Sequence, residues 1–365
     1  RQKISALKDF MKYYMKRSVK IMIDFRSDTV TRPTQRMRDA MYRAEVGDDV
    51  YGDDVTVNKL QEYIAQLCGM EAALFVPSGT FCNQLALFTH CNRGDEIILP
   101  DECHIVQHEA GSAAIISGVN MRTLPTYNGK MELDRLENAI RKEEDIHYPE
   151  TKLICIENAF SDGTVVDLEY MRSVKRIADR YKLKIHLDGA RFFNAVTSLN
   201  CEIRDITENV DSLNICLSKG LCAPIGSVLV GTKEFIKSAT KKRKIMGGGM
   251  RQVGVLAAAG QIAVKEMRLR LVEDHDNARY LAERLDIISG IEVLRNKLDI
   301  NMVFFKVRDE KLKNYFTVEN FAKYGIIINP EENGLFRFVT HYYISREAID
   351  ETIDLIIKLK ERSQR

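Results

Sequence analysis

A lysine between two predicted buried strands is the first residue of this sequence that could do chemistry. The apolar runs 213–217 and 227–230 predict strands, and Lys219 lies between them in a turn rich in serine, glycine and proline. Because burying an ammonium group is costly, a lysine at the end of a buried strand needs either a function or a route to solvent. The functional interpretation is a lysine that forms a Schiff base, and the structural one is a loop lysine that reaches water.

An aspartate at the end of an earlier strand favours the functional interpretation. The short apolar run 185–187 is followed by Asp188 and then by Gly189, which opens the next turn. Side chains at strand ends in α/β sheets face the ligand crevice. An aspartate in this position suits the partner of the pyridinium nitrogen of pyridoxal phosphate (PLP), the cofactor that pairs with a Schiff-base lysine.

Three longer motifs carry a resemblance to a known family. They read His-Leu-Asp-Gly-Ala-Arg at 186–191, Leu-Ser-Lys-Gly-Leu-Cys-Ala-Pro-Ile-Gly-Ser at 217–227, and Gly-Gly-Gly-Met-Arg-Gln at 247–252. Together they resemble the low-specificity L-threonine aldolases, which are fold type I (aspartate-aminotransferase-like) PLP enzymes. The resemblance covers roughly residues 23 to 345.

The resemblance implies both a fold and a reaction. The expected fold is a large α/β domain with a mostly parallel sheet and a small α+β C-terminal domain. The expected reaction is retro-aldol cleavage of the Cα–Cβ bond of L-threonine or L-allo-threonine, which gives glycine and acetaldehyde. The alternative is another PLP-dependent lyase or a racemase acting on a different β-substituted amino acid.

Length and composition set further bounds. The 365 residues suggest about two domains. We assign residues 1–22 to an N-terminal extension, 23–265 to the large domain and 266–365 to the small domain. The extension is basic and mildly amphipathic, so an added surface helix is expected there, with a targeting segment as the alternative.

The charge and the cysteines exclude several classes of protein. A net charge of +2 gives no strong field for nucleic acid or anionic membranes, and no apolar run is long enough to span a bilayer. The eight cysteines are scattered through apolar runs, which is typical of buried reduced thiols and not of a disulfide framework or a zinc site. We therefore expect a cytoplasmic enzyme without a structural metal.

A glycine turn before a helix is a candidate phosphate site. Gly79 and Thr80 lie between the predicted strand 72–76 and the predicted helix 81–91. Free N–H groups at a helix N-terminus attract anions, although an ordinary helix cap has the same pattern. The resemblance assigns both residues to the PLP phosphate.

Two histidines are candidates for the catalytic base. His104 follows the predicted strand 95–99, and the resemblance implies that its ring stacks on the cofactor. Glu109, five residues further on, is a candidate to orient a ring nitrogen. His147 matches a second histidine of the family, which touches the β-hydroxyl group of the substrate. The sequence does not decide which of the two accepts the proton.

The resemblance also supplies groups for the substrate carboxylate. Arg337 and Arg191 are expected to bind it, Arg191 also contacting the cofactor, and Ser27 is expected to assist. The guanidinium fork of arginine suits a carboxylate. Without the resemblance, Ser27 reads as a helix-capping serine.

Two further residues point to shared active sites. Tyr51 lies in the acidic, glycine-containing segment 47–54, which lacks the spacing of a calcium-binding loop. The resemblance implies that Tyr51 reaches a neighbouring site and that Arg251 reaches the phosphate of the adjoining subunit. A homodimer or homotetramer is therefore expected.

The sequence departs from the family at one point. Where the family usually has Glu-Asn-Thr-His-Asn, residues 157–161 read Glu-Asn-Ala-Phe-Ser. Ala159 and Phe160 replace a hydroxyl group and an imidazole. We expect cofactor binding to persist and the preferred substrate side chain to change.

Overall fold

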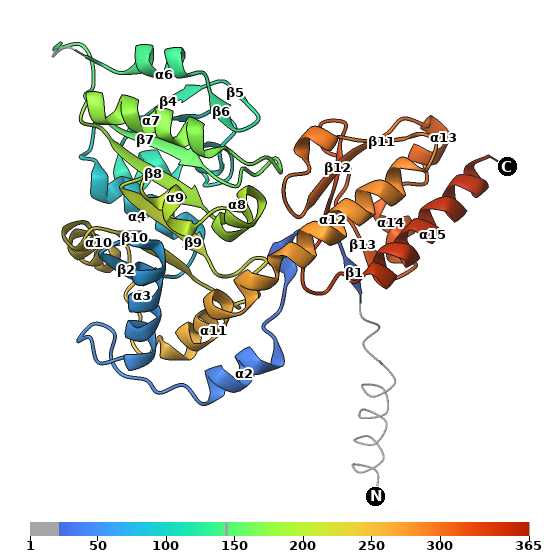
Figure 1. The fold of residues 1–365 in the computed structure, drawn as a ribbon, viewed down its shortest axis with the longest axis horizontal. Coiled ribbons are helices and arrows are strands. Elements are labelled where there is room, and N and C mark those ends of the chain that lie inside the picture. The colour runs from blue at the N-terminus through green and yellow to red at the C-terminus, as the bar shows by residue number, and fades with distance from the viewer. Residues whose placement is uncertain (1–21, 143–144, 365) are drawn as a thin grey trace, which may run out of the picture.

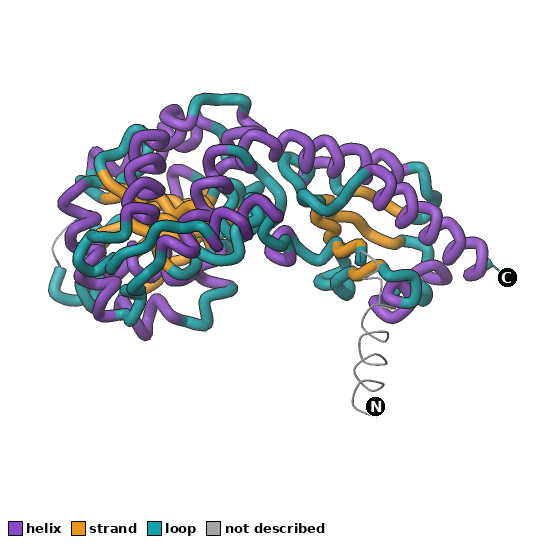
Figure 2. Tube along the Cα trace, turned by 90° about the horizontal axis from the view of Figure 1, so that it is seen from below, coloured by secondary structure: helices purple, strands orange, loops and turns teal. Residues whose placement is uncertain are grey.

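The computed structural model describes residues 22–142 and 145–364. The expectation of an N-terminal surface helix falls on residues outside these ranges. The described chain forms a large and a small domain, whose strands make up separate groups (Figures 1 and 2).

The large domain is built on a seven-stranded sheet. Its strands follow the order β2-β10-β9-β8-β7-β3-β4, and β10 alone runs antiparallel to its neighbours. The mostly parallel sheet predicted from the sequence is thus confirmed. The strand bounds are β2 Ala72–Val76, β3 Glu96–Pro100, β4 Asn120–Leu124, β7 Thr151–Glu157, β8 Lys184–Gly189, β9 Ser212–Cys216 and β10 Ser227–Gly231.

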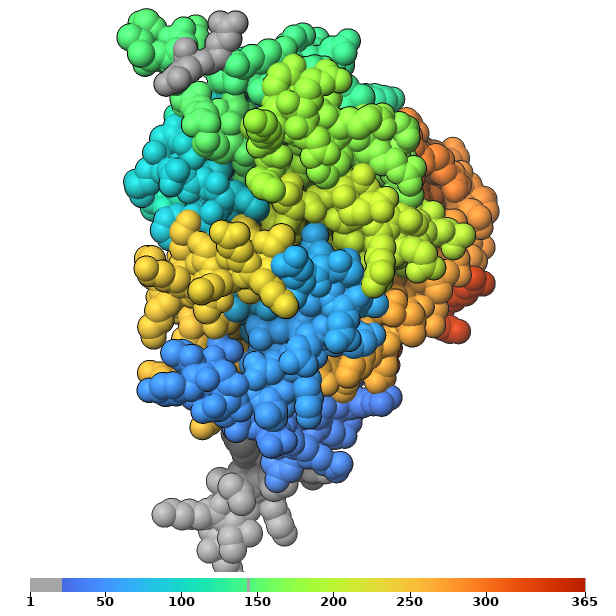
Figure 3. Space-filling view, turned by 60° about the vertical axis from the view of Figure 1, so that its left-hand side comes forward, coloured from blue at the N-terminus to red at the C-terminus, as the bar shows by residue number. Residues whose placement is uncertain are grey.

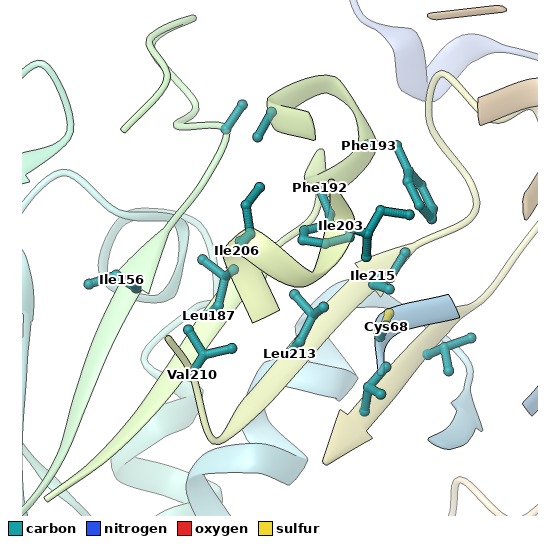
Figure 4. Packing of buried hydrophobic residues seen from close by; sticks show 14 of the residues in the cluster. Cys68, Ile156, Leu187, Phe192, Phe193, Ile203, Ile206, Val210, Leu213 and Ile215 are labelled. Carbon is teal, nitrogen blue, oxygen red and sulfur yellow. The ribbon is translucent and has the colours of Figure 1, made fainter. Parts of the chain in front are cut away.

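Both faces of this sheet are buried, because successive side chains of a strand point to opposite sides. In β7, Ile154 and Ile156 belong to one apolar cluster, whereas Leu153 and Cys155 belong to another. Figure 4 shows the first cluster, where Ile156, Leu187 and Leu213 from neighbouring strands pack with side chains of α8 and α9.

Helices cover the two faces. Helix α4 packs on β9 and β10, and α7 packs on β8 (Figure 1). Side-chain caps fix several starts: Thr34 accepts the Met37 amide at the start of α2, and Asp54 accepts the Val57 amide at the start of α3. The bounds are α2 Gln35–Tyr42, α3 Val55–Cys68, α4 Gly79–His90, α5 His104–Gln107, α6 Leu133–Ala139, α7 Leu168–Arg180, α8 Phe192–Leu199, α9 Ile203–Thr207, α10 Lys233–Ile245 and α11 Gly254–Lys265.

The small domain is α+β, as predicted. Strands β11 (Ile291–Val293), β12 (Met302–Val307) and β14 (Phe336–Val339) form an antiparallel sheet in that order. The helices α12 (Leu271–Asp286), α13 (Glu310–Lys313), α14 (Val318–Ala322) and α15 (Arg346–Ser363) complete the domain.

The two apolar cores divide the chain differently from the predicted boundaries. Helix α12 joins the domains, because Leu271 belongs to the core of the large domain and Leu281 to that of the small one. The entry strand β1 (Ile23–Asp24) pairs with β13 (Ile326–Ile327), and Phe25 stacks on Phe338 at 4.8 Å between ring centres. The entry segment therefore packs with the small domain. Residue periodicity could not show this pairing, because it joins segments about 300 residues apart.

The cysteine prediction is confirmed. All eight cysteines are free thiols, and all except the half-buried Cys201 are buried. Within the described ranges, no helix combines the length and the apolar character that crossing a membrane requires.

Candidate active site

The carboxyl ends of three parallel strands bring the main candidates together. Asp188 lies near the end of β8, His104 follows β3, and Lys219 follows β9. Nitrogen and oxygen atoms of His104, Glu109 and Asp188 lie within 4.8 Å of one another. The hydrogen bond to Glu109 raises the pKa of His104 and the positive charge of Lys219 opposes that rise, so the lysine shares this neighbourhood. The sheet topology thus assembles the set that the sequence predicted.

Lys219 has a fixed backbone and a free side chain. Its carbonyl oxygen accepts hydrogen bonds from Thr31 Oγ1 at 2.7 Å and from the Cys222 amide at 2.9 Å. Its ammonium group takes part in no hydrogen bond or ion pair within the described part of the chain. A lysine held by its backbone, with an uncommitted amine, is suited to covalent chemistry.

Asp188 is buried and receives three hydrogen bonds. Asn83 Nδ2 donates to Oδ2 at 2.7 Å, while the Ala190 amide and Asn214 Nδ2 donate to Oδ1 at 3.0 and 3.2 Å. Asp188 therefore offers a carboxyl group that three donors hold in one orientation at the strand end.

His104 is oriented from two sides. Its Nδ1 lies 2.8 Å from Glu109 Oε1, and its backbone amide donates to Glu157 Oε2 at 2.8 Å. The hydrogen bond to Glu109 raises the pKa of His104, while burial opposes that shift. The Nε2 atom of His104 has no partner in the described ranges, so it is available to a reacting group.

Glu157 lies beside Asp188, since the two residues are paired across β7 and β8. Burial raises the pKa of Glu157 to about 7, and the charge of Asp188 adds to this effect. The carboxyl group accepts the amides of His104 and Ser161, both at 2.8 Å. Glu157 therefore fixes the start of α5 and the loop that follows β7.

The start of α4 forms a cradle in which a side chain at residue 79 would not fit. A Cβ atom on Gly79 would lie 2.6 Å from Cys216 Sγ. The amides of Gly79 and Thr80 lie in the first turn of the helix, where intrahelical acceptors are missing. Free amides at the N-terminus of a twelve-residue helix suit a phosphate group.

Replacing Gly79 with alanine should destabilise the protein by about 1–3 kcal/mol, because the new methyl group meets a sulfur atom in a packed core. Replacing Cys216 with alanine in the same chain should recover most of this loss. Gly249→Ala is the matched control, since its Cβ would meet only Lys244 Cδ at 3.7 Å. Urea unfolding measures all three variants, and a double variant no more stable than Gly79→Ala would contradict the proposed contact.

Arg191 is already paired in this structure. Its Nε and Nη2 donate to the two carboxylate oxygens of Asp28 at 2.8 and 2.6 Å, and both residues are buried. Burial alone would raise the pKa of Asp28, but Arg191 and Lys219 lower it to about 2. Two of the donors of Arg191 are therefore used for Asp28, which the sequence did not suggest.

This pair should stabilise the fold at neutral pH and lose its effect in acid. A carboxyl group whose folded-state pKa is lowered contributes stability above its ordinary pKa of 3.8, and that contribution disappears as pH falls toward 2. We expect the free energy of unfolding of the wild type to exceed that of Asp28→Asn by about 2 kcal/mol at pH 7. This difference should become smaller below about pH 4. Urea unfolding at several pH values measures this. Asp354→Asn on α15 is the control. An equal difference in the free energy of unfolding between wild type and Asp28→Asn at pH 7 and at pH 3 would contradict the prediction.

Arg337 lies in the same region without an acidic partner. Its Nη2 donates to the Arg26 carbonyl oxygen at 3.2 Å, and no carboxylate pairs with it in the described residues. Burial lowers the pKa of Arg337, and the charge of Arg191 lowers it further. A largely desolvated guanidinium next to another one favours the binding of an anion.

His147 is one of three predicted site residues that lie away from the strand-end cluster within one chain. It precedes β7, at the edge of the sheet where Glu96 of β3 donates to the Glu150 carbonyl oxygen. The seven residues of β7 rise about 3.3 Å each, so about 20 Å separates this edge from Asp188. The His147 side chain is 77% exposed and contacts Asp145. Segment 145–149 projects at the upper left of Figure 3. Within one chain, His147 therefore cannot touch the same substrate as Lys219, and its role at the site stays a prediction.

Tyr51 and Arg251 lie on the surface, outside the strand-end cluster. Tyr51 is 78% exposed, and the Arg251 side chain, 67% exposed, pairs with Asp48 at 2.8 Å. Arg243 of α10 holds the same acidic segment through Asp49 at 2.6 Å. Segment 47–54 and α10 lie side by side in Figure 3. Neither Tyr51 nor Arg251 contributes to the cluster within one chain.

Ser27 acts as a helix cap in this structure. Its Oγ accepts the Thr29 amide at 3.2 Å and begins the short 3₁₀ turn Asp28–Val30. The capping interpretation of this serine is thus correct. Ser27 is still next to Asp28, which holds Arg191.

Ala159 and Phe160 lie in apolar cores and not among the polar groups of the site. They are 2% and 1% exposed, and Phe160 packs against Gly129. The preceding Asn158 ties its loop together through hydrogen bonds with the Val166 amide and carbonyl groups. The departure from the family pattern therefore changes the packing of a loop behind the site.

Sequence reasoning missed several polar residues that hold this cluster, among them Asp28, Asn83 and Asn214. A signal was present. Strands 184–189 and 212–216 carry polar side chains at alternate positions although both are buried, namely His186, Asp188, Ser212 and Asn214. An apolar–polar alternation in a strand covered on both faces indicates a polar cluster under the covering helix.

The fold of this chain is shared with solved structures of other proteins. The structure resembles the threonine aldolase of Leishmania major, with a TM-score of 0.78 and 20% identity over 93% of this chain and 99% of that one. It also resembles the serine palmitoyltransferase of Sphingomonas wittichii, with a TM-score of 0.75 and 14% identity over 94% and 88% of the two chains. At such identities the likeness establishes the fold alone, which is that of the fold type I PLP-dependent enzymes.

Sequence similarity narrows the class. The model of the beta-eliminating lyase family matches residues 24–308. The chain is 46% identical to the low specificity L-threonine aldolase of Escherichia coli K12 over 90% of its own length and 97% of that protein. It is 43% identical to low-specificity L-threonine aldolase 1 of Arabidopsis thaliana over 91% and 94% of the two chains. The chain therefore belongs to the beta-eliminating lyase family, within its group of low-specificity L-threonine aldolases.

Proposed function

We propose that this protein is a PLP-dependent aldolase that cleaves L-threonine and L-allo-threonine to glycine and acetaldehyde. The observation that carries the proposal is the arrangement of Lys219, Asp188 and His104 at the carboxyl ends of β9, β8 and β3, with Arg337 nearby and without a carboxylate partner among the described residues. The similarity to the Escherichia coli aldolase over almost the whole chain supports the choice of reaction.

The residues present fit PLP. Lys219 has a free amine for covalent attachment, and Asp188 offers a fixed carboxylate for the pyridine nitrogen. Gly79 and Thr80 offer first-turn amides for the phosphate group, and the glycine leaves a space that a Cβ atom would fill. The His104 ring is assigned to the face of the pyridine. When bound, the cofactor supplies an electron sink for the carbon from which a bond is broken.

The substrate carboxylate is assigned to Arg337. A guanidinium that is largely desolvated and has no carboxylate partner among the described residues gains a charge-assisted pair when the amino acid binds. Arg191 keeps Nη1 beyond its pair with Asp28, and Ser27 adjoins that pair, so both are assigned supporting roles. These contacts orient the amino acid, so that its Cα–Cβ bond is presented for cleavage.

The proton of the β-hydroxyl group is assigned to His104. Its Nε2 is unpaired in the described chain, while Glu109 fixes the other ring nitrogen. A base oriented in this way takes the hydroxyl proton as the Cα–Cβ bond breaks and acetaldehyde leaves. A proton then returns to Cα, which completes glycine. His147 is excluded from this role within the same chain by its place at the opposite edge of the sheet.

We also propose that the active enzyme is a homodimer or a homotetramer in the cytoplasm. Tyr51 and Arg251 are exposed on one chain, which is compatible with roles at the site of a neighbour. The eight free thiols suit a reducing compartment.

Product analysis tests the reaction. Aldol cleavage of L-threonine yields glycine, whereas β-elimination would yield 2-oxobutyrate and racemisation would yield D-amino acid. We expect glycine as the main product from the PLP-loaded protein. A PLP-bearing protein that forms 2-oxobutyrate or D-amino acid without glycine would support the alternative, another lyase or a racemase on the same scaffold.

A further inference from the structure

A stripe of polar side chains crosses the buried face between α4 and the central strands. His186 and Asp188 of β8 and Ser212 and Asn214 of β9 face Asn83 of α4, and all five are at most 2% exposed. The same face is apolar on either side of the stripe. Buried polar groups are costly unless they are paired, so the pairing inside the stripe shows what it does.

The amide nitrogen of Asn83 joins two carboxylates. Asn83 Nδ2 lies 2.7 Å from Asp188 Oδ2 and 2.8 Å from Glu109 Oε1. Because the amide nitrogen carries two protons, it donates one to each acid. Asp188 is the acid assigned to the pyridine nitrogen, and Glu109 is the acid that orients His104. One amide group therefore connects the two ends of the site.

The remaining contacts fix the direction of this amide. Asn83 Oδ1 lies 3.1 Å from His186 Nε2 and 3.1 Å from Asn214 Nδ2. Since the two carboxylates accept from Nδ2, Oδ1 must accept, so His186 carries its proton on Nε2. His186 Nδ1 then accepts from Ser212 Oγ at 2.9 Å, and Ser212 Oγ accepts from His90 Nε2 at 2.7 Å.

His186 and His90, which adjoins the stripe through Ser212, are neutral. Burial lowers the pKa of His186 to about 4 and that of His90 to about 3. A neutral imidazole has one donor and one acceptor nitrogen, as the contacts of His186 require. Each hydrogen bond is thus donated in the same direction, from His90 to Ser212, then to His186, to Asn83 and finally to the two carboxylates.

We propose that Asn83 is a positioning residue that couples Asp188 to Glu109, so that proton binding at the pyridine end and at His104 is linked through one amide. His186 holds that amide in place. The inference deepens the proposed function and rests on it for the role of Asp188. Without Asn83, two carboxylates within 4.8 Å of each other would lose a shared donor in a buried place, which favours the uptake of a proton.

Several charged or titratable groups surround His104. Glu109 bonds to its ring, and Glu157 accepts its amide. Asp188 and Lys219 act on it through their charges, and the ring of His108 lies 5.5 Å away. A single replacement therefore has to be compared with a matched one.

Gln84 provides the matched control. It is the next residue on α4, it is equally buried, and its Nε2 donates to Glu109 Oε2 at 2.6 Å. Its side-chain nitrogen donates to Glu109 and not to Asp188 in the described structure. Asn83→Leu removes a donor from both acids, whereas Gln84→Leu removes one from Glu109 alone. Asn83→Ala, which leaves room for water, is the second variant if the leucine variant does not fold.

Two titrations measure the effect of Asn83 at His104 and at the cofactor. NMR of ¹⁵N-labelled histidine in the cofactor-free protein gives the pKa of His104, and visible absorbance of the PLP-loaded protein against pH reports on the cofactor. In Asn83→Leu we expect both titrations to move to higher pH by about one unit, the scale of one charge-assisted hydrogen bond. In Gln84→Leu only the His104 titration should move.

Two outcomes would overturn the proposal. One is an Asn83→Leu protein in which neither titration moves, and the other is one in which only His104 responds, as in Gln84→Leu. A wild-type protein that binds no PLP would contradict the proposed function instead, and the His104 titration would still be readable in that case.

Discussion

Replacing Lys219 with alanine should give a colourless protein with at least about 10⁴-fold lower turnover, since the variant loses both covalent attachment of the cofactor and a group that can move protons. The fold should persist, because the Lys219 ammonium makes no hydrogen bond or ion pair in the described chain and the neighbouring turn is held through backbone atoms. Visible absorbance after PLP loading, together with turnover of L-threonine, measures both effects.

A lysine far from the site provides the control for this variant. Lys358 is exposed on α15, and Lys358→Ala should keep both the colour and the activity. If Lys219→Ala kept the absorbance of the wild-type protein, the assignment of Lys219 as the cofactor lysine would be wrong.

Asp188→Asn should lower turnover by about 100-fold, because it removes the charge that favours a protonated pyridine nitrogen. The change also disturbs hydrogen bonding. Asp188 accepts from Asn83 at one oxygen and from Ala190 and Asn214 at the other. Whichever oxygen the new NH₂ group replaces, it therefore points at another donor. Turnover and the pH dependence of the cofactor absorbance both report this loss.

Asp211→Asn separates the role at the pyridine from a general effect on the strand. Asp211 accepts the Ile185 amide at 2.9 Å, at the opposite end of β8, and pairs with Lys184 at 2.8 Å. Its replacement should change stability without altering the titration of the cofactor. A PLP-loaded Asp188→Asn protein with turnover within about threefold of wild type would contradict the role assigned to Asp188.

Several features could be predicted from sequence for a physical reason. The strand that ends at Asp188 and the turn that holds Lys219 are local patterns, and a parallel sheet brings strand ends to one edge. The position of β12, the start of α2 after Thr34 and the free cysteines likewise follow from periodicity, capping and composition.

Other features depend on contacts between distant segments. The pairing of β1 with β13, the pair of Asp28 with Arg191, and the contact of Asn83 with Asp188 join residues more than 100 positions apart. A linear pattern does not show such pairs. The place of His147 could not be predicted for a similar reason, because its match to a motif does not tell at which end of the strands the residue lies within one chain.

Release of acetaldehyde is the most direct test of the central claim. PLP-loaded protein is mixed with L-threonine or L-allo-threonine, and acetaldehyde is followed through a coupled alcohol dehydrogenase. We predict release from one or both substrates, with glycine formed in equal amounts, and the ratio of the two rates gives the stereochemical preference. A yellow, PLP-bearing protein that releases no acetaldehyde from either substrate would contradict the proposed reaction.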